Sequence, residues 1–527
     1  MRACLLALLL SMSVFAAPAV ADVKPARLFS DHAVLQQGVA VPVWGTADAG
    51  ERVTVSLGDQ KHSTTADDKG HWVVRLDPLQ AGGPMEMTVA GKNTVRIADL
   101  YAGEVWLCSG QSNMDMRIAK TKERYWCGVN NEAEELAAAN YPQMRMFVTD
   151  FKLADEPQTD VTGDWKVTTP QNAPDFSATA YFFGRELHKT LKVPVGLVVS
   201  SYGASTAQAW ISREAIAAQP QLAPMLEEYA KACRDFESGA AQAKYQQALK
   251  DWDAASAKAK ADGKPAPKKP GAPKDPHKDQ HNPCVLYNGM IAPVIPYAIK
   301  GAIWYQGESN GVDSYRYLPL MKTLIADWRG RWGEREFPFD FVQLAAIGTP
   351  TGTSTARVRD AQLKTLDAVP NTAMAVTIDI GEAKNVHPKN KQEAGRRLAL
   401  PALALAYGQK IPYSGPLFER MMILGNGIDG DSIRIHFTHT DGGLVAKGGS
   451  LTGFAIASAD GKFVPAEATI DDDTILLHSK DVPQPTKVRY AFADFPTCNL
   501  YNGAGLPASP FNIDADEAAT EPSTGSH

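Results

Sequence analysis

The pattern of hydrophobic and polar positions divides the chain into successive parts, and the first is a β region. Between residues 22 and 97, short segments that alternate apolar and polar positions are separated by glycine, aspartate and proline turns; they lie at 41–44, 52–56 and 72–76. Alternation of this kind is typical of strands with one buried face. It predicts a small antiparallel β-sandwich over residues 22–97.

Continuous apolar runs replace this alternation between residues 98 and 420. They are separated by helix-like stretches and lie at 104–108, 195–199, 301–305, 339–343 and 373–378. Unbroken apolar strands joined by helices predict a parallel sheet covered on both faces, which is an α/β fold. On such a sheet, ligands bind beyond the carboxyl ends of the strands.

The last part of the chain, residues 421–527, returns to alternation. Its alternating segments lie at 432–437, 453–457, 474–478 and 487–492. They predict a C-terminal β-rich region.

An insertion at 213–283 interrupts the α/β region. Leu226, Tyr229, Cys233 and Phe236 follow helical spacing, whereas residues 254–283 are rich in alanine, lysine and proline. This composition predicts a solvated loop for residues 254–283. No aromatic residue is interleaved with its lysines, so the segment is not expected to bind a polyanion.

The first 21 residues have the features of a secretory signal peptide. Arg2 precedes a leucine-rich run, and the small residues Ala19 and Ala21 form the exit. We expect cleavage after Ala21 and export to the periplasm or the medium. Beyond this segment, no apolar run approaches the roughly 18 residues of a membrane span, so no membrane partner is expected.

Composition narrows the possible functions. The 527 residues include 53 basic and 59 acidic ones, a net charge of −6, which argues against a nucleic-acid binder. Five cysteines follow Cys4, without a CxxC pair, so neither a disulfide framework nor a zinc site is indicated. An exported protein could form one disulfide bridge from these cysteines, and the sequence does not choose its partners. Cys108 is the best candidate for a buried, inert thiol. We expect no metal and no cofactor, and the sequence carries no signal for an oligomeric state.

Ser112 and His387 are the candidates for covalent catalysis. Ser112 lies in the motif Ser-Gly-Gln-Ser-Asn-Met at 109–114, directly after the first apolar strand, where a serine is held exposed between strand and helix. His387 lies in a loop after the last apolar strand, and a neutral imidazole there can take the serine proton. Taken alone, the serine motif favours a helix N-cap, and a single loop histidine is more often a solvated residue than a base.

Two further motifs lie at strand ends of the same sheet. Gln306, in Trp-Tyr-Gln-Gly-Glu-Ser-Asn at 304–310, has an amide that can donate to a developing oxyanion, and Gly203 can bring a backbone N–H close to the same place. Each motif is also explained as a turn. Four polar strand ends on one edge of a sheet nevertheless favour an active site.

These motifs resemble those of sialate O-acetylesterases of the SGNH hydrolase superfamily. The resemblance extends over almost the whole mature chain except the lysine- and proline-rich loop, and it is carried by residues 27–35, 109–114, 176–183, 203, 209–210, 304–310, 378–381, 387–388 and 499–507. It implies a flavodoxin-like α/β/α esterase domain flanked by N-terminal and C-terminal β domains.

The resemblance also implies roles for single residues. Ser112 is the implied nucleophile and His387 the general base, with the N–H groups of Ser112 and Gly203 and the side chain of Gln306 as the oxyanion hole. Many SGNH enzymes have an aspartate three residues before the histidine, where this chain has Lys384. The orienting group is then Glu382, which we rank first, or Asp379, or a backbone carbonyl. In the same region Ala204 takes the place of a second glycine expected after Gly203.

The sequence therefore predicts an exported carbohydrate O-acetylesterase that forms an acetyl-serine intermediate. The expected partner is an O-acetylated carbohydrate, sialic acid in the first place, and the candidate sugar-binding residues are Trp210, Tyr305 and Asn310. Two alternatives stay open. One is an acetylesterase of plant-wall xylan or xyloglucan, and the other is a non-catalytic carbohydrate-binding protein.

Overall fold

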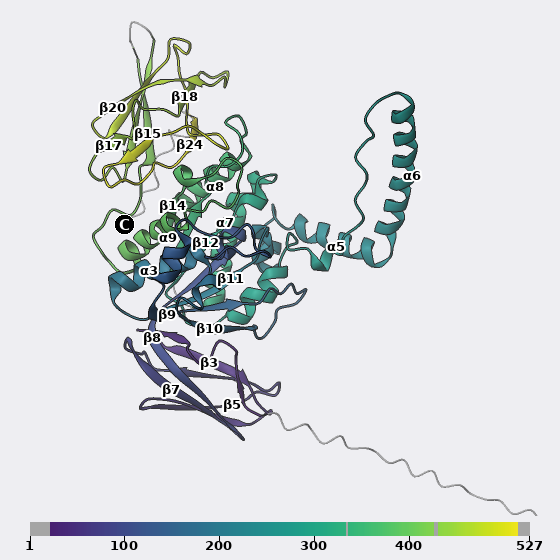
Figure 1. The fold of residues 1–527 in the computed structure, drawn as a ribbon, viewed down its shortest axis with the longest axis vertical. Helices are drawn as coiled ribbons and strands as arrows, with labels where there is room; N and C mark the ends of the chain where they lie inside the picture. The colour runs from purple at the N-terminus through teal and green to yellow at the C-terminus, as the bar shows by residue number, and fades with distance from the viewer. Residues whose placement is uncertain (1–21, 334–335, 426–429, 515–527) are drawn as a thin grey trace, which may run out of the picture.

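The computed structural model describes residues 22–333, 336–425 and 430–514, so the predicted signal peptide lies outside the described residues. The central α/β part of the chain lies between an N-terminal and a C-terminal β part (Figure 1). No helix in the described part of the chain is long and apolar enough to cross a membrane.

The central sheet positions the candidate site. Its strands lie in the order β10-β9-β11-β8-β12-β13-β14. All neighbours are parallel except β9 and β10. Their bounds are β8 (Thr94–Gly110), β9 (Tyr141–Thr149), β10 (Gly163–Thr168), β11 (Val195–Ser201), β12 (Gly301–Tyr305), β13 (Phe339–Gln343) and β14 (Thr372–Val376). The five apolar runs are therefore strands of one sheet, and the predicted α/β class is confirmed.

The chain leaves β8 toward β9 and β11 on one side and reaches β12, β13 and β14 on the other side later. The carboxyl end of β8 is thus the switch point of the sheet, where ligands of open α/β sheets bind.

Helices cover both faces of this sheet. Helices α3 (Ala178–Leu191) and α9 (Lys391–Pro401) pack together on one face, whereas α7 (Tyr317–Trp332) and α8 (Ser354–Ala368) pack together on the other. Trp106 contacts Phe183 of α3 at 5.1 Å between ring centroids, and Trp304 contacts Trp328 of α7 at 5.8 Å. Because Trp304 pairs with Ser109, three residues along β8 from Trp106, the two tryptophans face opposite sides. Burial on both faces explains why the strands are apolar throughout.

The N-terminal part is a β-sandwich that is continuous with the central sheet. One of its sheets contains β1 (Lys24–Pro25), β3 (Val41–Thr46) and β6 (His71–Leu76), and the other contains β2 (Val34–Gln36), β4 (Arg52–Leu57), β5 (Gln60–Thr65), β7 (Gly82–Ala90) and the first half of β8. Strand β8 runs without interruption across the border predicted at residue 97. Both parts consequently share one hydrophobic core.

The C-terminal part has a separate core, formed by residues such as Ile435, Ile456 and Phe511. Its strands are β15 (Leu417–Leu424), β16 (Ser432–Thr438), β17 (Leu444–Ala446), β18 (Phe454–Ala457), β19 (Val464–Pro465), β20 (Glu467–Asp471), β21 (Thr474–His478), β22 (Lys487–Tyr490), β23 (Leu500–Asn502) and β24 (Phe511–Asp514). The predicted border near residue 420 falls within β15.

The insertion forms a helical arm, and its helices extend beyond residue 254, where the sequence predicted a loop. Helices α4 (Arg213–Ala217), α5 (Pro224–Glu237) and α6 (Ala240–Ala261) occupy it, and Figure 1 shows α5 and α6 projecting from the body of the molecule. Helix α6 buries none of its residues. The loop prediction was wrong for residues 254–261, because alanine and lysine are strong helix formers and need no packing partner to favour a helix.

Candidate active site

Ser112 is placed by a sharp turn at the carboxyl end of β8. The strand ends at Gly110, and Ser112 begins the single-turn helix α1 (Ser112–Asp115). A Cβ atom at Gly110, whose φ is +139°, would lie 2.2 Å from the carbonyl oxygen of Tyr305, so only glycine fits there. Ser112 is 8% exposed, and its Oγ has no hydrogen-bond partner among the described residues.

Gly203 lies beside Ser112. Strand β11 pairs with β8 as far as Ser201 and Gly110, and a Cβ atom built on Gly203 would lie 3.9 Å from Ser112 Cβ. Neither the N–H of Ser112 nor that of Gly203 has an acceptor among the described residues. Ala204, where a second glycine was expected, has a φ of +55° and so occupies the left-handed region that is costly for alanine. The structure therefore brings the first two predicted oxyanion donors together.

Gln306 follows β12 and is buried among polar groups. Its Nε2 donates to the Ser205 carbonyl at 3.0 Å and to Asn310 Oδ1 at 2.7 Å, and Tyr317 Oη donates to its Oε1 at 3.0 Å. Because a carbonyl only accepts, the bond to Ser205 fixes which amide atom is nitrogen. Both amide hydrogens are thus used within the protein, and the role of Gln306 as oxyanion donor stays a prediction.

His387 lies in the loop after β14, with its imidazole packed on Trp126 at 4.6 Å between ring centroids. Its Nε2 is buried and has no hydrogen-bond partner among the described residues. Burial, and after it the charge of Lys391, lowers the pKa of His387 to about 4. The imidazole is therefore neutral near pH 7, which is the state that a general base requires.

The two candidate acids have other partners. Glu382 accepts from Asn385 Nδ2 at 3.0 Å and from the Lys389 N–H at 3.0 Å, and Asn385 Oδ1 in turn accepts from the His387 N–H at 3.0 Å. Glu382 thus supports the histidine loop indirectly, through Asn385, and makes no hydrogen bond to the ring.

Asp379 forms an ion pair with the buried Arg397. Its carboxylate accepts from Arg397 at 2.6 and 2.8 Å, and from Tyr501 Oη at 3.2 Å. Among the described residues, no hydrogen bond joins either candidate acid to the His387 ring.

The structure corrects the predicted sugar-binding residues. Trp210 is 0% exposed, donates through Nε1 to Ser205 Oγ at 2.9 Å and packs on Trp304. Tyr305 is 1% exposed, and Asn310, at 2%, donates to Gln208 Oε1 at 3.1 Å. All three side chains lie in the interior, where they stabilise the sheet and the turns at its strand ends. None of them presents a surface to a sugar.

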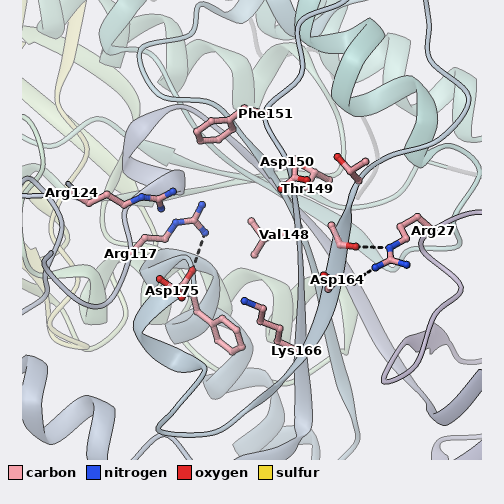
Figure 2. Close-up of a pocket in the computed structure, with 13 residues that line it drawn as sticks. Arg27, Arg117, Arg124, Val148, Thr149, Asp150, Phe151, Asp164, Lys166 and Asp175 are labelled. Carbon is pink, nitrogen blue, oxygen red and sulfur yellow. Dashed lines mark hydrogen bonds and ion pairs between the residues drawn. The ribbon is translucent and has the colours of Figure 1, made fainter. Parts of the chain in front are cut away.

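A cavity of about 620 Å³ lies at the carboxyl end of β9, the next strand but one from β8. Figure 2 shows Arg117 and Arg124 directed into it from one side and Lys166 from another. Arg27 pairs with Asp164, and Arg117 Nη2 donates to Asp115 at 2.8 Å. Arg124 and Lys166 have no ion-pair partner among the described residues, and the exposed side chains of Asp150 and Asp175 also line the cavity.

This cavity lies near Gly203 on one side and near His387 on another. Its Phe151 packs in a tilted arrangement against Tyr202, the residue before Gly203, at 4.7 Å between ring centroids. Its Arg124 lies two residues before Trp126, which packs on His387. Arg117, Arg124 and Trp126 could not be predicted as site residues, because they lie in an irregular segment without a periodic pattern.

The described residues contain no group of three or more histidine, cysteine or carboxylate side chains placed to hold a metal ion. The five cysteines among the described residues are free thiols, so none of them forms the disulfide bridge that the sequence allowed. Burial raises the pKa of Cys108 well above its usual value, in line with an inert thiol.

The α/β sheet is covered by helices on both faces, lies between two β parts and carries polar groups at the ends of β8, β11 and β12, and a solved carbohydrate acetylesterase has a similar architecture. Residues 280–404 match the family described as carbohydrate esterase, sialic acid-specific acetylesterase. The chain belongs to the sialate O-acetylesterase family, and it is an esterase.

The similarity to known members spans most of the chain. Sialate O-acetylesterase of Rattus norvegicus is 30% identical over 92% of this chain and 93% of its own length, and that of Homo sapiens is 29% identical over 92% and 90%. The crystal structure of a carbohydrate acetylesterase from Xanthomonas citri is 33% identical and covers 93% of this chain and 99% of its own, with a TM-score of 0.77.

Proposed function

We propose that this chain is an exported esterase that removes O-acetyl groups from sialic acid, with Ser112 as nucleophile and His387 as general base. The observation that carries the proposal is a group of atoms at one sheet edge that have no hydrogen-bond partner among the described residues: Ser112 Oγ, His387 Nε2, and the N–H groups of Ser112 and Gly203. The rat and human relatives, named sialate O-acetylesterases, support sialic acid as the sugar.

Acylation begins when Ser112 Oγ attacks the acetyl carbonyl carbon while its proton passes to His387 Nε2. The carbonyl oxygen becomes an oxyanion, and the N–H groups of Ser112 and Gly203, which have no acceptor in the described part of the chain, are available to stabilise it. The bond from the carbonyl carbon to the sugar oxygen then breaks, and the imidazolium returns the proton to that oxygen. The products are the free sugar hydroxyl and acetyl-Ser112.

Deacylation repeats these steps with water. His387 takes a proton from water as the water oxygen attacks the acetyl carbon, and the imidazolium returns this proton to Ser112 Oγ as the acyl bond breaks. Acetic acid leaves and loses its own proton to the solvent to give acetate. The lowered pKa of His387 favours this sequence at neutral pH, because the ring must be uncharged at the start of each half-reaction.

Release of acetate from O-acetylated sialic acid, acetylated xylan and acetylated xyloglucan tests the proposal. We expect the highest kcat/KM on sialic acid and a loss on the order of 10⁴-fold or more in Ser112→Ala, because no acetyl-serine can form. A higher kcat/KM on xylan or xyloglucan would show that a plant-wall polysaccharide is the substrate. A fully active Ser112→Ala would show that Ser112 is not the nucleophile. Absence of turnover on all three substrates would mean that this esterase acts on another acetylated substrate, and the sialic acid proposal would be wrong.

Export is tested separately. The N-terminus of the protein recovered from the periplasm or the medium of a bacterial host is expected to be Asp22, since cleavage follows Ala21. Recovery of the protein in the cytoplasm with Met1 or Arg2 at its N-terminus would contradict this part of the proposal.

A further inference from the structure

Asn113, the residue after Ser112, joins three segments that are far apart in the sequence. It is 1% exposed, and its Nδ2 donates to Glu308 Oε1 at 2.5 Å and to the Val386 carbonyl at 2.9 Å. Its Oδ1 accepts from Lys391 Nζ at 2.8 Å. The Val386 carbonyl only accepts and the Lys391 ammonium only donates, so the amide has one orientation that satisfies all its partners.

Lys391 is the first residue of α9 and is 0% exposed. Besides Asn113, its Nζ donates to the Pro388 carbonyl at 2.6 Å. The carbonyls of Val386 and Pro388 flank His387 in the sequence. Both are therefore held by buried donors, and these two donors are hydrogen-bonded to each other.

A buried lysine is costly unless its hydrogen bonds and charge are compensated. Burial lowers the pKa of Lys391 to about 7, whereas the charges of Glu308, Glu382 and Cys127 act in the opposite direction. Burial likewise raises the pKa of Glu308. Packing alone does not require this set of groups, because an apolar side chain would fill the position of Lys391 at a lower cost.

We infer that Asn113 and Lys391 form a clamp that holds both sides of His387 and fixes the base against the Ser112 turn. Lys391 is thereby a positioning residue, and Glu308 keeps the Asn113 amide in its orientation. The inference rests on the proposed roles of Ser112 and His387. A displacement of about 1 Å between reacting groups is enough to lower turnover on the order of 10²-fold.

Lys391→Met is the first test, because methionine has a similar length but neither donors nor charge. We expect kcat to fall on the order of 10²-fold with KM within about twofold of the wild type. The acid limb of the pH profile is expected to move to higher pH, because the Lys391 charge lowers the pKa of His387.

Arg329→Met is the matched control. Arg329 is also buried and donates to carbonyls, those of Phe337 at 3.0 and 2.8 Å, Pro370 at 2.9 Å and Asn371 at 2.7 Å, at the opposite edge of the sheet. Its loss is expected to lower Tm without changing kcat or the acid limb. If Lys391→Met lost activity only in proportion to Tm, or kept a normal kcat, the clamp would be disproved.

A double-mutant cycle with Asn113→Ala covers the case in which a single variant folds poorly. The effects of the two substitutions on log kcat are expected to be non-additive, because both residues belong to one clamp. The double variant Asn113→Ala/Lys391→Met should therefore lose little more kcat than either single variant. Additive losses in log kcat would overturn the inference. Wild type and Ser112→Ala are assayed alongside. If turnover depends on Ser112 but not on the clamp residues, the clamp inference fails and the proposed mechanism stands; if turnover does not depend on Ser112, the mechanism itself fails.

Discussion

The His387 imidazole lies in surroundings that disfavour its charged form. Burial is the larger cause of its lowered pKa, and the charge of Lys391 is the second. A general base of ordinary pKa, near 6.5, would lose activity below that pH. Because the pKa of His387 is about 4, we expect kcat/KM to stay near its plateau at pH 5.5 and to fall only as the pH approaches about 4.

This expectation is checked with a pH series on a soluble acetyl ester, with Tm measured at each pH to exclude unfolding. His387→Ala should lose most activity at every pH. An acid limb centred near 6.5 would show that the imidazole is more exposed to water in solution than in the structure.

Glu382 and Asp379 differ in what they contact. Glu382 bonds to Asn385 and Lys389 around the histidine, whereas Asp379 pairs with Arg397. We expect Glu382→Gln to lower kcat by roughly 10-fold, well short of the 10⁴-fold loss known for an aspartate bonded directly to a catalytic histidine. Asp379→Asn should chiefly lower Tm, because the buried Arg397 then keeps only one of its two carboxylate partners, Glu393. Kinetics and thermal unfolding of both variants measure this difference, and a 10⁴-fold loss in Glu382→Gln would require direct contact with the ring.

Among the elements of the fold, the helical arm is the one whose removal is most informative. Helix α6 buries no residue, and Trp252 Nε1 donates to the Pro267 carbonyl at 2.7 Å, so the distal arm contacts mainly itself. By contrast, His277 bonds to Asp155 at 2.9 Å, and Thr206 Oγ1 donates to the His281 carbonyl at 2.9 Å. The end of the insertion therefore belongs to the body of the molecule.

Replacing residues 241–270 with a short Gly/Ser linker is expected to leave kcat/KM within about twofold and Tm within a few degrees, because no core contact is lost. A second deletion that extends through residue 283 should lower the yield of folded protein. Loss of activity in the shorter deletion would show that the arm takes part in substrate binding.

Most strands of the central sheet could be predicted because burial on both faces leaves a continuous apolar run. Strand β9 did not give this signal, since Arg145 interrupts it. Arg145 is 2% exposed and is tolerated because it pairs with Asp99 at 3.0 Å and lies over the Tyr101 ring. Such compensation comes from residues more than forty positions away and leaves no periodic pattern.

The strand-end motifs were predictable for a similar reason, since parallel strands bring their carboxyl ends to one edge. The buried contacts behind them were not. Lys391 follows a loop and begins a helix, where a lysine ordinarily faces water, and its contact with Asn113 spans 278 positions. The same limit applies to Trp210 and Tyr305, whose aromatic side chains fit a sugar platform and a core equally well in sequence.

At the scale of the whole molecule, the three parts of the chain meet around the α/β sheet. The N-terminal sandwich continues into it through β8, and the C-terminal part reaches it through Tyr501 Oη, which donates to Asp379 at 3.2 Å. The cavity with Arg124 uses Arg27 from the N-terminal part and residues from the segments after β8 and β9. Segments from two parts of the chain thus form a cation-bearing cavity next to the Ser112 turn.

Sialic acid carries a carboxylate, whereas the sugars of xylan and xyloglucan side chains that bear acetyl groups are neutral. Arg124 has no ion-pair partner among the described residues, while Asp150 and Asp175 at the cavity are exposed, where water and salt screen their charges. We therefore expect Arg124→Gln to raise KM for O-acetylated sialic acid by roughly 10-fold, which corresponds to about 1.4 kcal/mol, with little change in kcat.

The methyl ester of the same O-acetylated sugar isolates the charge, because it keeps every other group of the substrate. For this ester, the wild type and Arg124→Gln should have similar KM values, and the wild type should bind the ester less tightly than the acid. Lys122→Gln, an exposed cation on the same segment that does not line the cavity, is the matched control and should not distinguish the two substrates. The advantage of the free acid should also shrink as salt is raised, since a charge pair open to solvent is screened. Equal KM changes for acid and ester in Arg124→Gln would contradict the prediction. They would mean that the cavity binds the sugar by shape or through the sugar hydroxyls, and that the cations of the cavity do not bind the carboxylate.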